Sequence, residues 1–560
     1  MVLTQIAPSK YRFAHALIRE VLTSDLPVLA RAEIHHRIGL ALELFDDAAS
    51  ALAFHFEQAS PVLGSAREPI RYALEAARAA MARHAYEQAR DHCLGALSLA
   101  NDRGSSVHER GRILAELGEA QRCSGALDDA KATFSGLAEL GRSSRTPALI
   151  AEAALGYGRT HKENGLLEQP LVALLEEALG ALPPGEDRTR AELLGTLARA
   201  LIFDPLAPER RVSLSLEALE IARRNPDRST LSLVLASRVY ATWGARDPEI
   251  VREWPRVVDA AVGAAEQARH YESLMEMRVL AVTAALQAGT RAEALASLEL
   301  AEHLAQRLQH PSQLYFIASA RSALALYEGR LDEVPALKAR AHALGQPLGR
   351  VASVFDLLQT IVLAREAGDM NSLVERAPAI ALATNSALAA RTAVLWIYTE
   401  AGMLDVAQSE LSNLSVPLLT SAFDANWLSW YVVLGRALVE LSASTLCDPL
   451  YRELLPFAGL VAVCGSVGAV LGHVSLTLGV LARQLGELDA ACDHLQSALK
   501  ESRVAGARPE QARAHLELAR TLELLGRRRE ARSELIFAEQ LASEVGMKKV
   551  LSDVAALRGV

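Results

Sequence analysis

Histidine and cysteine are the residues most often recruited for catalysis and metal binding, and their spacing here assembles no reactive site. His35 and His36 are adjacent, so on a helix they point about 100° apart and cannot share a metal ion as an i, i+4 pair would. His55 stands between Phe54 and Phe56 with no second histidine at helical spacing. We therefore predict a packed or capping role for His55 and no metal site.

Sequence motifs of other catalytic classes are also missing. The chain has no GxSxG nucleophile turn, no GxGxxG after a strand, and no CxxC pair among its five cysteines. Without such motifs we expect no enzyme and no cofactor. The thiols and the first ten residues, which lack the features of a secretory signal, are typical of a reduced, cytoplasmic protein.

A regular spacing recurs along the chain instead. A Gly is followed after five residues by Ala, after four more by Leu or Phe, and after three more by a small or apolar residue. The copies begin at Gly125, Gly289, Gly402, Gly486 and Gly526, with the alanines Ala130, Ala294, Ala407, Ala491 and Ala531. Offsets of four and three place these positions on one helical face, and Gly ends the preceding helix because it tolerates a left-handed backbone. Each copy therefore predicts a pair of antiparallel helices.

These positions resemble the tetratricopeptide repeat, whose consensus has Leu-Gly in the first helix, Gly at the turn, and Ala, Phe and Ala in the second. The best copy is Leu117, Gly118, Gly125, Ala130 and Phe134, and in a looser copy His84 replaces the turn Gly. The resemblance implies an all-α fold, a right-handed superhelical array of helical hairpins. The repeats step by about 40 residues, longer than the standard repeat of roughly 34, so we expect longer helices.

Composition agrees with such an array. Half of the residues are hydrophobic but only 5% are aromatic, which suits close packing of helices. No long Gly/Ser-rich, Pro-rich or charged linker divides the chain. We predict a helical segment over 1–60, tetratricopeptide-like repeats over 61–420 and C-terminal repeats over 421–560.

The charge distribution argues against nucleic acid as a partner. The net charge is −9 with Lys and Arg interspersed among Asp and Glu, so we expect no direct nucleic-acid binding.

The run from Leu454 to Ala482 lacks Asp, Glu, Lys and Arg and is long enough to cross a bilayer. Pro456, five glycines and several polar residues interrupt it, so we predict two buried helices and no membrane contact. A membrane-associated adaptor is the alternative.

A second resemblance lies near the start of the chain. The segment Tyr11 to Glu20, YRFAHALIRE, resembles the Phe-x-His-x-Leu-Ile-Arg-Glu segment that closes the ATPase part of bacterial signal-transduction ATPases, including LuxR-type transcriptional regulators. In that family the segment belongs to a small helical domain before the repeats, where His15 would have a packing role. No Gly-Lys dipeptide occurs, so the phosphate-binding loop of those ATPases is absent, and too few residues follow Gly546 for a helix-turn-helix.

These features favour a non-catalytic scaffold in bacterial signalling or transcriptional regulation, binding a protein partner or a small effector in a concave groove. The alternative is a C-terminal fragment of an ATP-dependent regulator whose nucleotide module lies upstream of Met1. Self-association stays open. In the repeat that it resembles, the first helix of each hairpin lines the groove, which gives the candidate partner-binding residues Arg112, Glu119, Arg122, Trp396, Arg513, Arg520 and Glu523. We assign Trp427 and Trp430 first to the core.

Overall fold

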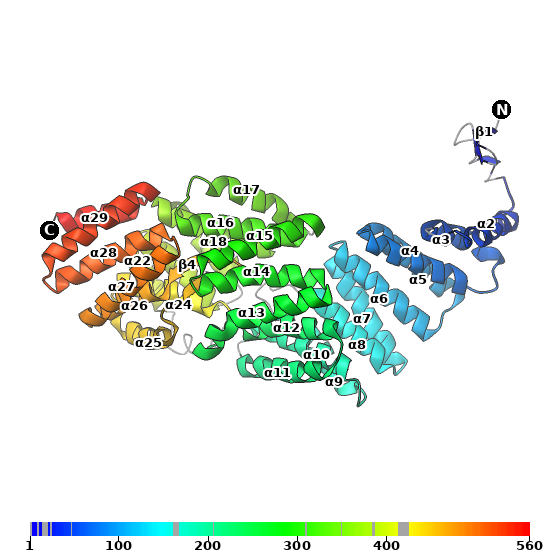
Figure 1. Cartoon of the computed structure of the whole chain (residues 1–560), viewed down its shortest axis with the longest axis horizontal. Helices are drawn as coiled ribbons and strands as arrows, with labels where there is room; N and C mark the ends of the chain where they lie inside the picture. Colours follow the sequence, from blue (N-terminus) through cyan, green and yellow to red (C-terminus); the bar gives the residue numbers. More distant parts are fainter. Residues whose placement is uncertain are drawn as a thin grey trace. The chain divides into compact units, whose positions relative to one another are not determined.

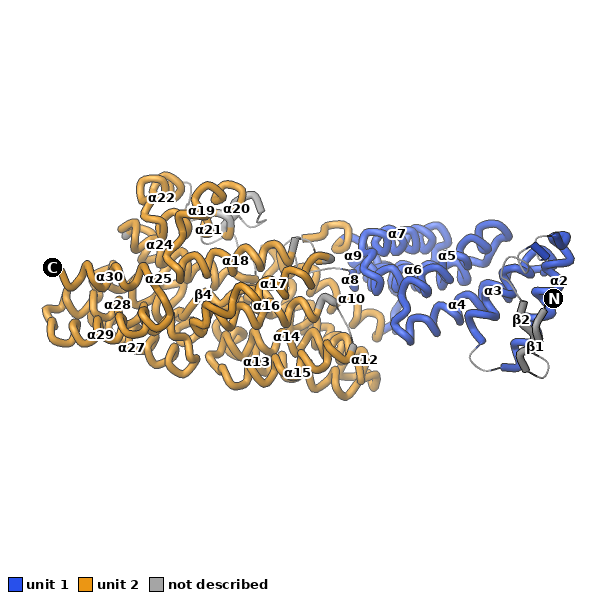
Figure 2. The backbone as a smooth tube through the Cα atoms, turned by 90° about the horizontal axis from the view of Figure 1, so that it is seen from above, with its two compact units in different colours: residues 1–161, 173–186 blue, residues 162–172, 187–560 orange. Residues whose placement is uncertain are grey.

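The structure, a computed structural model, describes residues 3–7, 10–13, 21–22, 25–45, 48–160, 167–204, 206–308, 311–348, 350–383, 387–412 and 425–559. The contacts between Cα atoms divide the chain into two compact units (Figure 2). Unit 1 comprises Met1–His161 and Ala173–Glu186, and unit 2 comprises Lys162–Val172 and Asp187–Val560. Each unit is described by itself below.

Unit 1 is built of antiparallel helices that follow one another closely (Figure 1). Its elements are β1 (Leu3–Ala7), β2 (Lys10–Phe13), α2 (Val28–Leu42), α3 (Ala49–Gln58), α4 (Arg67–Ala82), α5 (Tyr86–Arg103), α6 (Val107–Cys123), α7 (Leu127–Ser143) and α8 (Pro147–Thr160). The next helix, α9 (Gln169–Ala181), is shared between the two units.

Unit 2 begins with long helices in which each contacts the next. They are α10 (Asp187–Ala200), α11 (Pro208–Arg224), α12 (Arg228–Thr242), α13 (Pro248–Ala268), α14 (Tyr271–Gln287), α15 (Arg291–Leu308), α16 (Pro311–Glu328), α17 (Val334–Gly345) and α18 (Arg350–Ala367). Six further helices of the described residues follow: α19 (Asn371–Val374), α20 (Ala377–Ala383), α21 (Ala387–Glu400), α22 (Leu404–Leu411), α24 (Trp427–Glu440) and α25 (Ser444–Leu454).

The C-terminal part of unit 2 contains a strand pair and five helices. They are β3 (Val461–Cys464), β4 (Ala469–His473), α26 (Val474–Gln484), α27 (Leu488–Val504), α28 (Arg508–Leu524), α29 (Arg528–Val545) and α30 (Lys548–Arg558). Helices distant in sequence lie side by side, because α28 contacts α16 and α30 contacts α18. The C-terminal helices of unit 2 therefore pack against helices from its first half.

The predicted helical hairpins are confirmed at their turns. The glycines that open the five copies have φ between 74° and 86°, the left-handed region that favours Gly. Where His84 replaces the turn Gly, it takes a φ of 60° and the turn is kept. The hairpins α6–α7, α14–α15, α21–α22, α26–α27 and α28–α29 result, so the predicted all-α repeat array is confirmed.

The small residues of the pattern set how closely the two helices of a hairpin approach. All five pattern alanines are completely buried. A Cβ built on Gly118 would lie 2.7 Å from Cζ of Phe134 in the facing helix, closer than real contacts allow. Gly118 of the first helix and Phe134 of the second therefore pack directly against each other.

The prediction of two buried helices over Leu454–Ala482 is wrong for the first half of the run. Helix α25 ends at Leu454, a single turn follows, and β3 and β4 form an antiparallel hairpin before α26 begins at Val474. Left-handed backbone at Gly465 and Val467 makes the turn between the strands. The burial predicted for the run is confirmed for residues 461–482 but not for its start, where Leu455 is 43% exposed. No helix in the described ranges has the length and apolarity to span a bilayer.

Both faces of this hairpin are covered. Val461, Val463, Val467 and Val470 pack in the core cluster of α14–α16, whereas Ala462, Cys464, Ala469 and Leu471 pack in that of α18–α25. A strand buried on two sides carries apolar residues at every position, so it lacks the alternation that identifies a half-buried strand. The Gln359 side chain donates a hydrogen bond of 2.9 Å to the Gly468 carbonyl in the turn.

At the start of the chain, β1 and β2 pair antiparallel, with Leu3 opposite Phe13. Tyr11, Arg12 and Phe13, which the resemblance assigned to a helical domain, therefore lie in a strand. The rest of that motif, residues 14–20 with His15, lies outside the described residues, as does residue 414 of the third repeat copy.

Candidate ligand pocket in unit 2

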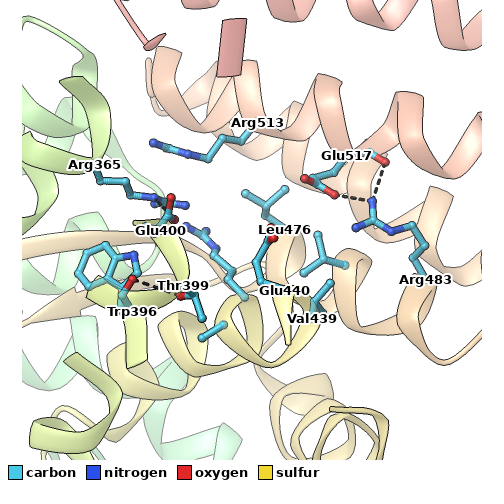
Figure 3. Close-up of a pocket in the computed structure, with 13 residues that line it drawn as sticks. Arg365, Trp396, Thr399, Glu400, Val439, Glu440, Leu476, Arg483, Arg513 and Glu517 are labelled. Carbon is cyan, nitrogen blue, oxygen red and sulfur yellow. Dashed lines mark hydrogen bonds and ion pairs between the residues drawn. The ribbon is translucent and has the colours of Figure 1, made fainter. Parts of the chain in front are cut away.

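A pocket lies where α18, α21, α24, α26 and α28 converge (Figure 3). Its interior leaves about 70 Å³ for the centres of water molecules. It is lined by Arg365, Trp396, Thr399, Glu400, Arg436, Ala437, Val439, Glu440, Leu476, Val480, Arg483, Arg513 and Glu517. Because α21, α24, α26 and α28 each open a helical hairpin, the pocket is lined mainly by the first helices of these hairpins.

The arginines of the pocket are held by glutamates on neighbouring helices. Nε of Arg365 donates to Glu400 at 2.8 Å, and Arg483 pairs with Glu517. Glu510, behind the wall, accepts from both Arg436 at 2.8 Å and Arg513 at 3.1 Å, and Arg513 also pairs with Glu366. The ion pairs therefore connect α18, α21, α24, α26 and α28 across the pocket.

Electrostatics keeps these carboxylates ionised despite their burial. Burial alone would raise the pKa of Glu510, but Arg436 and Arg513 outweigh it and lower this pKa to about 2. Burial would also raise the pKa of Glu400 and that of Glu517. Nearby arginines outweigh burial, so both pKa values are lowered. The network is thus a set of charged pairs at neutral pH.

Two lining groups are left without partners. Glu440, at the C-terminal end of α24, is exposed and makes no hydrogen bond or ion pair with any described residue. Desolvation by the surrounding helices raises the pKa of Glu440; Lys549 and Arg520 oppose this rise, and Glu517 and Glu400 add to it. Nε of Arg436, one turn earlier on the same helix, is buried and has no hydrogen-bond partner among the described residues. Among the residues that the structure describes, the pocket therefore has an unpaired carboxylate in its lining, and one lining arginine carries a buried N–H group without an acceptor.

The remaining wall is apolar. Leu476 and Val480 of α26 and Trp396 of α21 are buried, and the Arg365 guanidinium lies 5.8 Å from the centre of the Trp396 ring. In Figure 3, Arg365, Glu400 and Trp396 lie on one side, Arg483 and Glu517 on the other, and Glu440 between them. A ligand here would meet charged groups and a hydrocarbon surface together.

Two of the sequence-predicted residues meet in this pocket. Trp396 and Arg513 are both lining residues although 117 positions separate them. Arg520 lies just outside, where it pairs with Glu517 at 2.6 Å and with Asp553 at 3.0 Å. Glu523, at the end of the same helix, is half-buried and lies 3.8 Å from Arg528. Their role in binding stays a prediction.

The other three predicted residues lie on α6 in unit 1. Arg122 pairs with Glu119 at 2.8 Å, and Arg159 of α8 donates to the same carboxylate at 3.4 Å. Burial would raise the pKa of Glu119, but the two arginines lower it to about 2. Arg112 is exposed on the same helix. Glu119 and Arg122 thus form a charged cluster, with Arg112 free to contact other molecules.

The histidines reveal a pairing that the sequence spacing did not indicate. Nδ1 of His35 on α2 lies 2.8 Å from Nδ1 of His55 on α3, so His55 does have a histidine neighbour, across two helices. Burial lowers the pKa of both imidazoles. Within the described ranges, no three His, Cys, Asp or Glu side chains gather as a metal-binding group.

No protein-family model matches the sequence, and neither does any curated protein. Among solved structures, the chain is similar to a Rap protein complexed with Competence and Sporulation Factor, with 10% identity, coverage of 79% of this chain and 99% of that chain, and a TM-score of 0.32. For the APC/C hetero-tetramer Cut9-Hcn1 these values are 15%, 88%, 91% and 0.42. For yeast Tom70 they are 13%, 94%, 95% and 0.27. At these values the likeness carries no conclusion about ligands or partners.

Several pocket residues escaped the sequence reasoning. Arg436 interrupts the apolar run WLSWYVVLGRALVE, and Arg365 and Glu366 end another apolar helix. A lone charge in a helix that is apolar on all sides must be buried and paired, so this pattern is a usable signal. Their partners could not be inferred, because they come from other helices, 35 residues away for Arg365, 74 for Arg436 and 147 for Glu366.

Proposed function

We propose that this chain is a non-catalytic repeat scaffold that binds a protein partner or a small effector in bacterial signalling or transcriptional regulation. The observation that supports this most is the pocket with unused charged groups, lined by helices that begin at five separate places in the sequence. A molecule bound there contacts all five helices, so it would favour one arrangement of them over others. The signalling context rests on the likeness of residues 11–20 to the ATPase-associated segment.

In this proposal unit 1 supplies the contact with a protein partner. Arg112 is exposed on α6, next to the charged cluster of Glu119 and Arg122. Exposed arginines are frequent anchors of protein interfaces. Helices of successive hairpins lie side by side there, since Arg159 of α8 reaches Glu119 of α6.

The test is amide hydrogen exchange of the full chain with and without a small-molecule extract of bacterial cells. An effector in the pocket is expected to slow exchange in α18, α21, α24, α26 and α28 together, because it bridges them. The extract treated to remove small molecules is the control. Unchanged exchange in all five helices, together with failure of Arg112→Glu to weaken binding to any interacting protein, would refute the proposal.

A further inference from the structure

The pocket combines opposite charges that their own neighbours do not use. Of the glutamates in its lining, Glu400 and Glu517 pair with arginines, whereas Glu440 forms no ion pair within the part of the chain that the structure describes. Of the arginines, Arg365 binds Glu400 through Nε, and its two terminal nitrogens donate no hydrogen bond to any described residue. Nε of Arg436 is buried and has no acceptor among the residues that the structure describes. A carboxylate that can bind a cation and guanidinium groups that can bind an anion therefore line the same pocket.

The spacing of these groups suits a ligand that carries both charges close together. Arg436 and Glu440 are four residues apart on α24, so their Cβ atoms lie about 5–6 Å apart on one face. They do not pair with each other because the terminal nitrogens of Arg436 bind Glu510. A lone cation would leave the arginine donors unused, and a lone anion would face the Glu440 carboxylate.

Size and apolar surface narrow the ligand further. The space of about 70 Å³ holds roughly five water molecules at 10–15 Å³ for each centre. Leu476, Val480 and Trp396 provide hydrocarbon contact at its wall. These dimensions fit a compact molecule with a short aliphatic group.

We propose that this pocket binds a free α-amino acid with a small aliphatic side chain. Its ammonium pairs with Glu440, its carboxylate accepts hydrogen bonds from Arg365 and Arg436, and its side chain contacts Leu476, Val480 and Trp396. A residue within a peptide lacks both charges on one carbon, so the site distinguishes free amino acids from peptide chains. This inference rests on the proposed function and names the class of small effector.

The test is titration of the full chain with L-valine, measured by calorimetry and by the tryptophan fluorescence of the chain, to which Trp396 in the pocket contributes. We expect saturable binding, and Glu440→Gln is expected to weaken it at least about tenfold because the ammonium loses its carboxylate. Glu299→Gln, which removes an exposed charge on α15, is the matched control and is expected to bind valine normally. Valinamide and N-acetylvaline, which each lack one charge, should also bind at least about tenfold more weakly.

Three results would overturn the assignment. They are no saturable signal with L-valine or L-leucine up to about 10 mM, undiminished binding to Glu440→Gln, and equal binding of valinamide. If L-valine and L-leucine do not bind while a cell extract still slows amide exchange in the five helices, the effector belongs to another chemical class and the proposed scaffold function stands. Unfolding of Glu440→Gln is checked by its melting temperature, and valinamide tests the same contact in the unaltered protein.

Discussion

Arg436 of α24 and Glu510 of α28 form an ion pair of 2.8 Å across 74 residues of sequence, with only 12% and 6% of their side chains exposed. Glu510 also accepts from Arg513 of its own helix and from the backbone N–H of His473, at the end of β4. One carboxylate therefore joins two arginines, two helices and the buried strand pair. Its loss would leave the Arg436 guanidinium buried without its partner, and Arg513 would keep only Glu366.

Replacement of Glu510 by Gln is expected to lower the free energy of unfolding of unit 2 by about 3–5 kcal/mol, the usual effect of breaking a buried ion pair. The five tryptophans, at positions 243, 254, 396, 427 and 430, all lie in unit 2, so their fluorescence in urea reports this unit alone. Glu530→Gln, in an exposed pair with Arg527, is the control and should leave the midpoint unchanged. Equal midpoints for the two variants would contradict a central role for Glu510.

Stability of unit 2 is expected to fall as the pH drops from about 5 to about 2. The folded pKa of Glu510 is about 2, against an ordinary value of 4.5, so the folded state binds this proton less readily than the unfolded state. The contribution is complete above the ordinary pKa and is lost as the pH approaches the folded pKa, by about 3 kcal/mol. Urea midpoints measured at a series of pH values check this. In Glu510→Gln the slope over this range should flatten, and an unchanged slope would assign the effect to other carboxylates.

Prediction from sequence succeeded where the information is local. The turn Gly, the Ala five residues later and the following Leu or Phe lie within one hairpin, so their spacing alone defines the contact, as Gly118 and Phe134 show. It also placed Trp427 and Trp430 in the core, where both are buried. Periodicity within a helix carries this information because one side of the helix always faces its neighbour.

The pocket required information that no local pattern contains. Trp396 and Arg513 were selected by repeat position, but Arg365, Arg436 and Glu440 come from helices in which the repeat spacing is not evident. The buried hairpin was missed for a related reason. Its strands are covered on both faces, and a short run that is apolar throughout cannot be distinguished from a buried helix by periodicity.

The turn glycines should be required for their backbone conformation alone. Gly526 has a φ of 74°, and a Cβ built on it meets no atom within 4 Å, so Gly526→Ala adds strain without a clash. We expect a loss of about 1 kcal/mol in the stability of unit 2. Gly263, inside α13 and equally open, is the matched control. Gly263→Ala should instead stabilise by up to about 1 kcal/mol, because Ala is the better helix former. Shifts of the tryptophan-detected urea midpoint with the same sign in both variants would contradict this.

The buried hairpin should depend on one close approach of a backbone to an aromatic ring. A Cβ on Gly468 would lie 2.6 Å from Cδ1 of Phe355, and the φ of Gly468 lies outside the left-handed region, so Gly468→Ala acts through this contact. The expected cost is about 1–3 kcal/mol in the urea unfolding of unit 2, as for other overpacked cores. Phe355→Leu removes the ring atoms that collide, so the double variant should be more stable than the sum of the two single changes predicts. Additive changes would show that Phe355 does not restrict position 468, and that the turn is held by Gln359 and the strand contacts instead.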